Sequence, residues 1–468
     1  MIFDIAYSAW ENCGDLRARR MRNKDFTYGR QWGDVIYDPV TKGYMAEESI
    51  AMRTGRQPLT NNLIRKLVKT IIGRYRAIRN GANDEKSEEL KELYRLNHLD
   101  ELDCRLLEEF LISGCAIQRV TVECRREGKV ETFVDNVSPG DFFINTVKDP
   151  RGWDVQLIGM LHDMTLAEVV MRYAHGDRKR AADIRKIYGE CNMTYGVNEP
   201  LGMGDVSAKE FFVSPTGRCR VIEVWTLESC ETLRCHDYST GEYYECPAAQ
   251  ESEINAENAR RQEKGLKPIE VLWNITTEWR CRIYAPNGEE IDSFVSPYAH
   301  GNHPFVVKLY PLIDGEVHSF VEDVIPQQKH INRLITLIDT IMSVSSKGAL
   351  LFPVQSKPDG LDWEDFRQNW AACGGIIPYS AKAGIPAPHQ ETASGLDAGA
   401  SRLLEVQLQM IQDVSGVNNT LYGGELGGNV GIERYERQIQ NASVTISDIL
   451  ETFCDLLKQR DEKAMSVK

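Results

Sequence analysis

The sequence predicts an α/β fold, and three observations support this class. Apolar and polar residues alternate in two β-rich regions bounded by turn signals, at residues 116–134 and 218–320. Apolar residues at helical spacing mark several helices outside these regions. From Pro326 onward, long amphipathic helices alternate with Gly- and Pro-rich stretches. With 468 residues and 42% hydrophobic content, the chain can fill a large core, divided into about two to four domains.

The first part of the chain is expected to be mainly helical. A basic stretch from Leu16 to Lys24 has helical character. The pair Asn61-Asn62 is typical of a helix start, and apolar residues then recur at helical spacing. Residues 84–112 predict a further helical region, which we expect to break at Asn97 and His98. Strand character then begins at Ala116.

Turn and capping signals organise the middle of the chain. Glu127-Gly128 predicts a turn between two strands of the first β-rich region. Thr165 and Glu168 have the spacing of a capping box, which predicts a short helix after them. Asn287-Gly288 predicts a tight hairpin in the second β-rich region, and the polar residues 250–267 predict an exposed helix before it.

The last third begins with a helix of about six turns. Its apolar residues lie on one face: Ile331, Leu334, Ile335, Ile338, Ile341 and Met342. Residues 349–395 are rich in Pro and Gly with short β-like runs, and a second helix covers 399–414. Residues 416–431 contain six glycines, so this segment is not expected to be rigid on its own. The final helix, from Ile432, has near-heptad apolar spacing.

The charge of the chain is unevenly distributed. Residues 1–80 hold 15 Lys and Arg against 8 Asp and Glu, a balance of +7. Because the net charge is −14, residues 81–468 carry −21. Tight binding of nucleic acid depends on neutralising many phosphates, so this acidic bulk argues against a protein that grips DNA firmly.

Signatures of enzymes and membrane proteins are missing from the sequence. It contains no Walker phosphate loop, no His-Glu-x2-His and no Gly-x-Ser-x-Gly motif, so no catalytic residue and no cofactor are predicted. No window approaches the ~18 apolar residues of a membrane span, and the N-terminus lacks the pattern of a secretory signal. The 12 cysteines are scattered, as expected for thiols in a reducing cytoplasm.

Two alternatives for metal chemistry stay open. Cys230, Cys235, His236 and Cys246 could form a zinc site, but their spacing is wrong for a zinc knuckle and free thiols on a hairpin are favoured. Scattered carboxylates such as Asp339 and Asp365 could serve a metal-dependent enzyme acting on nucleic acid, although they lie in no motif. We therefore predict no metal site.

The order of elements in the last third resembles portal proteins of tailed bacteriophages. Residues 1–322 would form a mixed α/β wing. The remaining segments would be a stem helix at 323–346, a small α/β clip at 347–394, a returning stem helix at 395–415, a tunnel loop at 416–431 and a long tunnel helix at 432–468. Because the given chain stops at Lys468, we expect the helical crown of the family to be short or absent, or the native chain to be longer.

Short motifs extend this resemblance to the podovirus type over most of the chain. They are Phe26, Gly29, Gln31 and Trp32, then Arg56, Pro58, Asn61 and Asn62, then residues 137–143 with Asp149 and Trp153, and finally 414–417 with 421–423. Each motif is weak alone, and their shared order carries the resemblance. We expect the wing to bury Trp32 beside the helix that follows the Asn pair.

The resemblance implies a structural protein of the virion. Subunits would form a dodecameric ring at one capsid vertex, assembled in the host cytoplasm as a head-to-tail connector within the major capsid protein shell. Double-stranded DNA would pass through the ring during packaging and ejection, and the terminase large subunit and then head-tail adaptor proteins would dock on it. No enzyme activity, cofactor or membrane partner is implied. The alternatives are a nucleic-acid enzyme and another virion ring or adaptor.

Candidate DNA-channel residues come from three segments. Lys329 and Arg333 lie on the polar side of the expected stem helix, facing either the lumen or the outer surface. Glu425 and Leu426 lie in the expected tunnel loop, which would point into the channel or, alternatively, form an outer surface loop. The nearest basic residues are Arg434 and Arg437, on the first turns of the next helix.

Candidate partner-binding residues lie in the expected clip. Trp363, Phe366 and Trp370 recur on one face of a short helix. They form either the small core of the clip or an aromatic anchor for a partner. The second interpretation is considered because aromatic residues dominate the energetics of protein interfaces.

Overall fold

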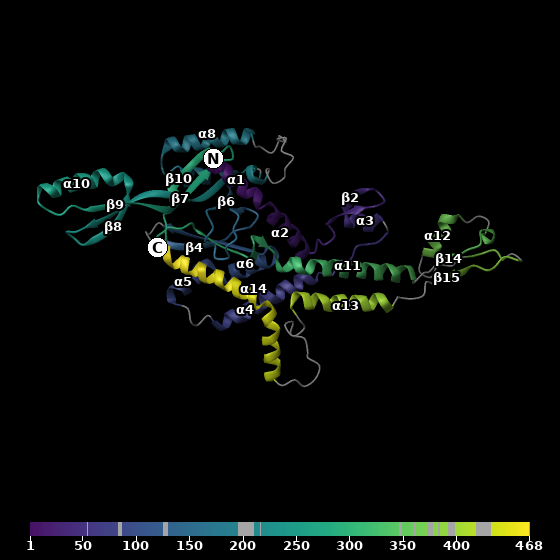
Figure 1. Ribbon diagram of the computed structural model, residues 1–468. Coiled ribbons are helices and arrows are strands. Elements are labelled where there is room, and N and C mark those ends of the chain that lie inside the picture. The colour runs from purple at the N-terminus through teal and green to yellow at the C-terminus, as the bar shows by residue number, and fades with distance from the viewer. Residues whose placement is uncertain are drawn as a thin grey trace. The chain divides into compact units, whose positions relative to one another are not determined.

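The computed structural model confirms the mixed α/β class (Figure 1). It describes residues 1–53, 55–82, 87–124, 130–194, 210–215, 217–345, 349–358, 362–371, 378–381, 384–391, 398–417 and 432–467. The chain divides into two compact units. Unit 1 comprises Met1–Lys24, Leu67–Glu322 and Thr420–Lys468, and unit 2 comprises Asp25–Lys66 and Asp323–Asn419.

The described residues of unit 1 form two main antiparallel sheets and one short strand pair. The larger has the strand order β10-β9-β7-β6-β5, with β8 also paired to β7. Its strands are β5 (Phe142–Ile144), β6 (Leu157–Met164), β7 (Cys219–Asp237), β8 (Glu242–Pro247), β9 (Glu270–Tyr284) and β10 (Glu290–Val295). The smaller consists of β11 (Phe305–Leu309), β3 (Cys115–Cys124) and β4 (Val130–Asn136), in that order. β12 (Pro311–Ile313) and β13 (Glu316–Val317) form a separate short pair.

Helices cover these sheets and join them. They are α1 (Ile2–Asn12), α2 (Gly14–Thr27), α4 (Leu63–Ala82), α5 (Glu88–Asn97), α6 (Leu99–Ser113), α7 (Leu166–Tyr173), α8 (Arg178–Thr194), α10 (Glu251–Glu263) and α14 (Ile432–Ser466), with a short 3₁₀ turn at Ala248–Gln250. α2 and α4 each have one end in unit 2.

Local sequence signals were accurate in unit 1. Thr165 and Glu168 form the predicted capping box at the start of α7. The predicted helix break lies at His98, whose left-handed backbone (φ 49°) separates α5 from α6. β9 and β10 form the hairpin around Asn287-Gly288, in which Gly288 has a positive φ of 84°. The exposed helix predicted at 250–267 is α10.

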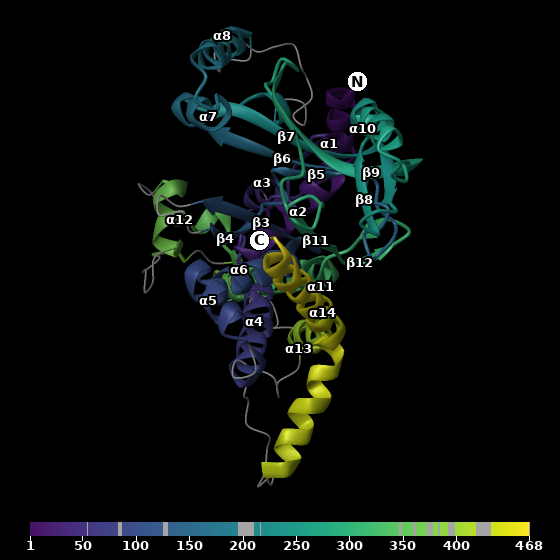
Figure 2. The ribbon, with the colours of Figure 1, turned by 90° about the vertical axis from the view of Figure 1, so that its left-hand side faces the viewer.

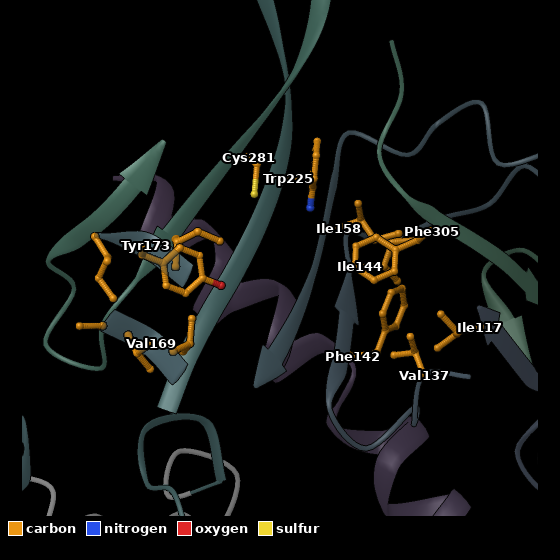
Figure 3. Close-up of a cluster of buried hydrophobic side chains, with 14 of the residues drawn as sticks. Ile117, Val137, Phe142, Ile144, Ile158, Val169, Tyr173, Trp225, Cys281 and Phe305 are labelled. Atoms are coloured by element: carbon orange, nitrogen blue, oxygen red, sulfur yellow. The ribbon is translucent and has the colours of Figure 1, made fainter. Parts of the chain in front are cut away.

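The main core of unit 1 lies between the two sheets and α7 (Figure 3). Phe142 packs edge-to-face on Phe305 of the smaller sheet, with ring centroids 5.8 Å apart. Trp225, Cys281 and Tyr173 continue the same cluster, and all are buried. Burying large apolar side chains from both sheets stabilises their packing by about 1.5–3 kcal/mol for each residue.

A buried carboxylate connects the two sheets of unit 1. Glu223 on β7 accepts two hydrogen bonds from Arg119 of β3, at 2.9 and 3.0 Å. It also accepts one from the indole of Trp225 at 2.7 Å and forms one with His162 of β6 at 2.6 Å. Burial alone would raise the pKa of Glu223, but Arg119 and His162 outweigh this effect and hold the pKa below its ordinary value.

Helix α14 is fixed in unit 1 by apolar contacts and by one buried ion pair. Phe453 lies between the rings of Tyr75 and Phe110, with centroid distances of 5.5 and 5.9 Å. Arg460, which is fully buried, donates to Asp103 of α6 at 2.9 Å, and Asp103 is fully buried as well. The predicted final helix is therefore confirmed, and its C-terminal half belongs to the core of unit 1.

Unit 2 is built on two helices, α11 (Phe320–Ser345) and α13 (Ala398–Ser415). Its other elements are β1 (Val35–Asp38), β2 (Gly43–Ala46), α3 (Glu47–Arg53), β14 (Ala349–Leu351), a 3₁₀ turn at Val354–Ser356, α12 (Trp363–Ala371) and β15 (His389–Glu391). The segment Asp25–Lys66 packs in this unit, although the sequence placed it in a wing over 1–322. The domain division expected from the sequence, with a wing over 1–322, stays a prediction.

Candidate functional site around helix α11

Two side chains of α11 form a buried amide junction with the segment before α4. The amide oxygen of Gln328 accepts from the backbone N–H groups of Leu63 and Ile64, at 3.0 and 3.3 Å. Its nitrogen donates to the carbonyl of Asn61 at 2.7 Å and to Asn332 at 2.9 Å. The first N–H groups of a helix have no partner within the helix, so Gln328 gives the N–H of Ile64 an acceptor and adds a second one for Leu63, which also donates to the Asn61 carbonyl at 2.9 Å.

The residues of the first sequence motif complete this junction. Gln31 accepts from the Asn332 side chain at 2.6 Å and donates to the Phe26 carbonyl at 2.7 Å. Asn62 caps α4 by accepting from the N–H of Arg65 at 3.1 Å. We name the residues Gln31, Asn61, Asn62, Gln328 and Asn332 the amide junction. Its α11 members were missed by sequence analysis, although Gln328, Asn332 and Thr336 recur every fourth residue on a largely apolar helix.

The predicted burial of Trp32 is only partial. Its side chain is half-buried and contacts the residues that come just before α4. The indole N–H donates to the Leu59 carbonyl at 3.3 Å and to the Thr60 hydroxyl at 3.1 Å. Trp32 therefore helps to hold the chain that leads into the helix, as a large side chain with one polar end commonly does.

The two basic candidates of α11 are brought together by acidic residues. Lys329 contacts Asp34 at 2.8 Å and Glu47 at 3.3 Å, and Arg333 donates to Glu47 at 2.5 Å. Burial alone would raise the pKa of Glu47, but the hydrogen bond and charge of Arg333, with the charge of Lys329, lower it below its ordinary value. We name Asp34, Glu47, Lys329 and Arg333 the ion-pair anchor, since it ties the β1–β2 segment to α11.

The aromatic candidates of α12 are divided between a small core and the surface. Phe366 is buried, and its ring lies edge-to-face on Phe352 at 4.5 Å. Trp363 packs against both rings, with its ring centroid 5.7 Å from that of Phe366 and 6.4 Å from that of Phe352. It nevertheless remains 43% exposed. Trp370 is half-buried. The helix predicted from this spacing is thus confirmed, and one residue of the three is available for contact.

The remaining channel candidates lie wholly or partly outside the described residues. Glu425 and Leu426 lie outside the described residues. Arg434 and Arg437 lie in α14, but their side chains are also outside the described part. Their roles therefore stay predictions.

The described residues offer neither a metal site nor a membrane-spanning helix. Among the described residues, no group of three or more His, Cys, Asp or Glu side chains could hold a metal ion. The thiols of Cys235 on β7 and Cys246 on β8 lie 3.8 Å apart, which places them on the expected hairpin. Asp339 and Asp365 are exposed on α11 and α12. No helix within the described ranges is long and apolar enough to cross a bilayer.

Comparison with known proteins decides the family. A model of the phage P22-like portal protein family matches residues 3–457, nearly the whole chain. The chain belongs to this family. A search of curated proteins found no match. Portal proteins of this family are structural rather than enzymatic, so the portal protein is a capsid-associated subunit of an oligomeric ring at a capsid vertex of the phage.

Proposed function

We propose that the portal ring is the channel through which phage DNA enters the capsid during packaging and leaves it at ejection. The observation that carries this proposal is the family match over residues 3–457, together with the order α11, α12, α13 and α14 along the chain. In this proposal α11 and α13 are the stem, residues 347–394 the clip and residues 416–431 the tunnel loop. The ring is dodecameric and lies within the shell of the major capsid protein.

A channel of this kind must surround DNA without holding it. The ion-pair anchor supports this, because Lys329 and Arg333 already face the carboxylates of Asp34 and Glu47. Cations that are neutralised within the subunit release fewer counterions from DNA, so binding stays weak. Under this proposal Arg434 and Arg437 supply the few mobile basic groups, and Glu425 and Leu426 meet DNA by steric contact.

The clip is proposed to dock first the terminase large subunit and later head-tail adaptor proteins. Trp363 is the candidate anchor, because it rests on Phe352 and Phe366 while 43% of its surface is exposed. A rigid aromatic side chain of this type is typical of interface hot spots. Phe366 supports the anchor from the core of the clip.

Electron microscopy and a packaging assay test the proposal together. The purified protein should form rings with a central channel, and rings should support terminase-driven uptake of DNA into proheads. Trp363→Ala should leave the rings intact but weaken terminase binding by about 30-fold, since truncating a hot-spot residue costs about 2 kcal/mol. Trp153→Ala is the matched control, because Trp153 is 76% exposed outside the clip. Equal docking by both variants, or a protein that stays monomeric, would contradict the proposal.

A further inference from the structure

The hairpin of β1 and β2 carries an uncovered apolar face. Val35, Tyr37 and Tyr44 are 65%, 54% and 78% exposed. Tyr37 pairs directly with Tyr44, so both rings point to the same side, where they pack edge-to-face at 5.6 Å. Contiguous exposed aromatic and aliphatic side chains on a soluble protein commonly mark a surface that binds another protein. We name these three residues the hairpin face.

The opposite side of the hairpin is held firmly within unit 2. Asp38 accepts from the backbone N–H groups of Val40 and Thr41, both at 3.1 Å, and from Arg53 at 2.6 Å. The ion-pair anchor then fixes the chain on either side of the hairpin to α11. The two tyrosines are therefore presented in a fixed arrangement, and binding through them would lose little conformational entropy.

Helix α13 carries a second uncovered apolar surface. Leu403, Val406, Met410 and Val414 recur at spacings of three and four residues, which places them in one stripe. All four are between 44% and 47% exposed, whereas Ile411, about a quarter-turn away, is buried. The stripe contains no charged side chain. We name these four residues the α13 stripe.

The two surfaces lie on opposite sides of one compact unit. In Figures 1 and 2, α3, which directly follows the hairpin, lies on one side of α11, and α13 lies on the other. A ring is closed by a head-to-tail interface, in which each subunit offers two different surfaces that fit each other. The family assembles as an oligomeric ring, so each subunit needs such a pair.

We infer that the hairpin face of one subunit packs against the α13 stripe of its neighbour in the ring. Both surfaces are apolar and uncharged, so they suit each other and offer nothing to bind the phosphates of DNA. Tyr37 and Tyr44 would supply rigid aromatic area, and Met410 can adapt its shape to them. The inference rests on the ring assembly of the proposed function and adds the surfaces that build it.

Charge-swap variants test this pairing. Tyr44→Lys and Met410→Glu each place an unpaired charge in the inferred interface, so each should lower the fraction of protein in rings at least about tenfold. The double variant should recover rings, because each new lysine meets the glutamate of the next subunit. Ring content is measured by mass photometry and electron microscopy, and the fold of each variant by circular dichroism and thermal unfolding.

Tyr243→Lys is the matched control, since Tyr243 is also 78% exposed but lies on β8 of unit 1. It should assemble like the wild type. Normal ring formation by both single variants would overturn the inference and leave the proposed function intact. Loss of rings that the second charge does not restore would also overturn it, because the hairpin face would then have a different partner. A wild-type protein that forms no rings would overturn both.

Discussion

Two long helices of the portal protein are fastened by different chemistry. In unit 1, α14 is held by the fully buried ion pair of Arg460 and Asp103, and Asp103 also accepts from Arg79 at 3.0 Å. In unit 2, α11 is held by the amide junction, in which Gln328 and Asn332 are both buried and uncharged. Both arrangements satisfy nearly every polar group that they bury.

The two arrangements should differ in how much stability is lost when one partner is removed. A charge left alone in the interior is far more costly than an unpaired amide or backbone group, because its lost hydration is much larger. An intact ion pair contributes less than this penalty suggests, since desolvation offsets its attraction. The helices are therefore expected to differ more in their response to mutation than in their native stability.

The largest effect is expected from Asp103→Ala. Removing this carboxylate leaves Arg460 buried without its main partner and should lower the free energy of unfolding by about 3–5 kcal/mol. Asp100→Ala is the control on the same helix, since Asp100 is 75% exposed and its pairing with Arg79 should be worth less than about 1 kcal/mol. Urea unfolding with amide exchange along α14 measures both, and similar losses would contradict the comparison.

A smaller effect is expected from Gln328→Ala. The change leaves the N–H groups of Leu63 and Ile64 and the carbonyl of Asn61 without their side-chain partner, at a cost of about 1–3 kcal/mol. Gln327→Ala should be nearly neutral, because the buried amide oxygen of Gln327 has no hydrogen-bond partner among the described residues. Amide exchange at Leu63 and Ile64 should accelerate only in the first variant. Equal acceleration in both variants would show that Gln328 does not specifically protect these two N–H groups.

Acid should loosen the ion-pair anchor before the amide junction. The pKa of Glu47 is lower in the folded protein, so its stabilising contribution is fully present above the ordinary carboxyl pKa of about 4.3 and is lost as pH falls through the folded value. Amides do not titrate in this range. Between pH 7 and 3, amide exchange corrected for intrinsic rates should therefore rise first at Tyr37 and Tyr44 and later at Leu63. The reverse order would contradict the assignment.

The smallest effect is expected from Arg333→Gln. The Arg333 side chain is 46% exposed, so its pairing with Glu47 should contribute less than about 1 kcal/mol. Raising the salt concentration should shrink the difference between this variant and the wild type, because ions screen exposed charges. The loss caused by Gln328→Ala should not change with salt. A salt-independent loss for Arg333→Gln would indicate that packing of its side chain, not its charge, holds the hairpin.

Sequence analysis succeeded where the cause lies within a few residues. The capping box of Thr165 and the hairpin at Asn287-Gly288 depend only on neighbouring residues, and both were confirmed. Helical spacing also predicted helices in the regions of α11 and α13, for the same reason. The resemblance to portal proteins also drew on Gln31 and Asn61, although nothing local reveals what they do.

Sequence analysis failed where the interacting residues are far apart in the chain. Gln31 meets Asn332 about 300 residues later, and Lys329 meets Asp34 across a similar separation. Lys329 and Arg333 therefore looked like free basic groups on a solvated helix face. The acidic residues that face them come from another segment, and spacing within one helix cannot reveal such a partner.

The buried Glu223 has a mechanical consequence for unit 1. One carboxylate gathers donors from β3, β6 and β7, so it joins both sheets at a single point. If one sheet slid past the other, Glu223 would move away from Arg119, and a buried carboxylate would lose its charged partner on the neighbouring sheet. The packed sheets should therefore resist sliding past each other, because the shift would leave a buried charge without its main partner.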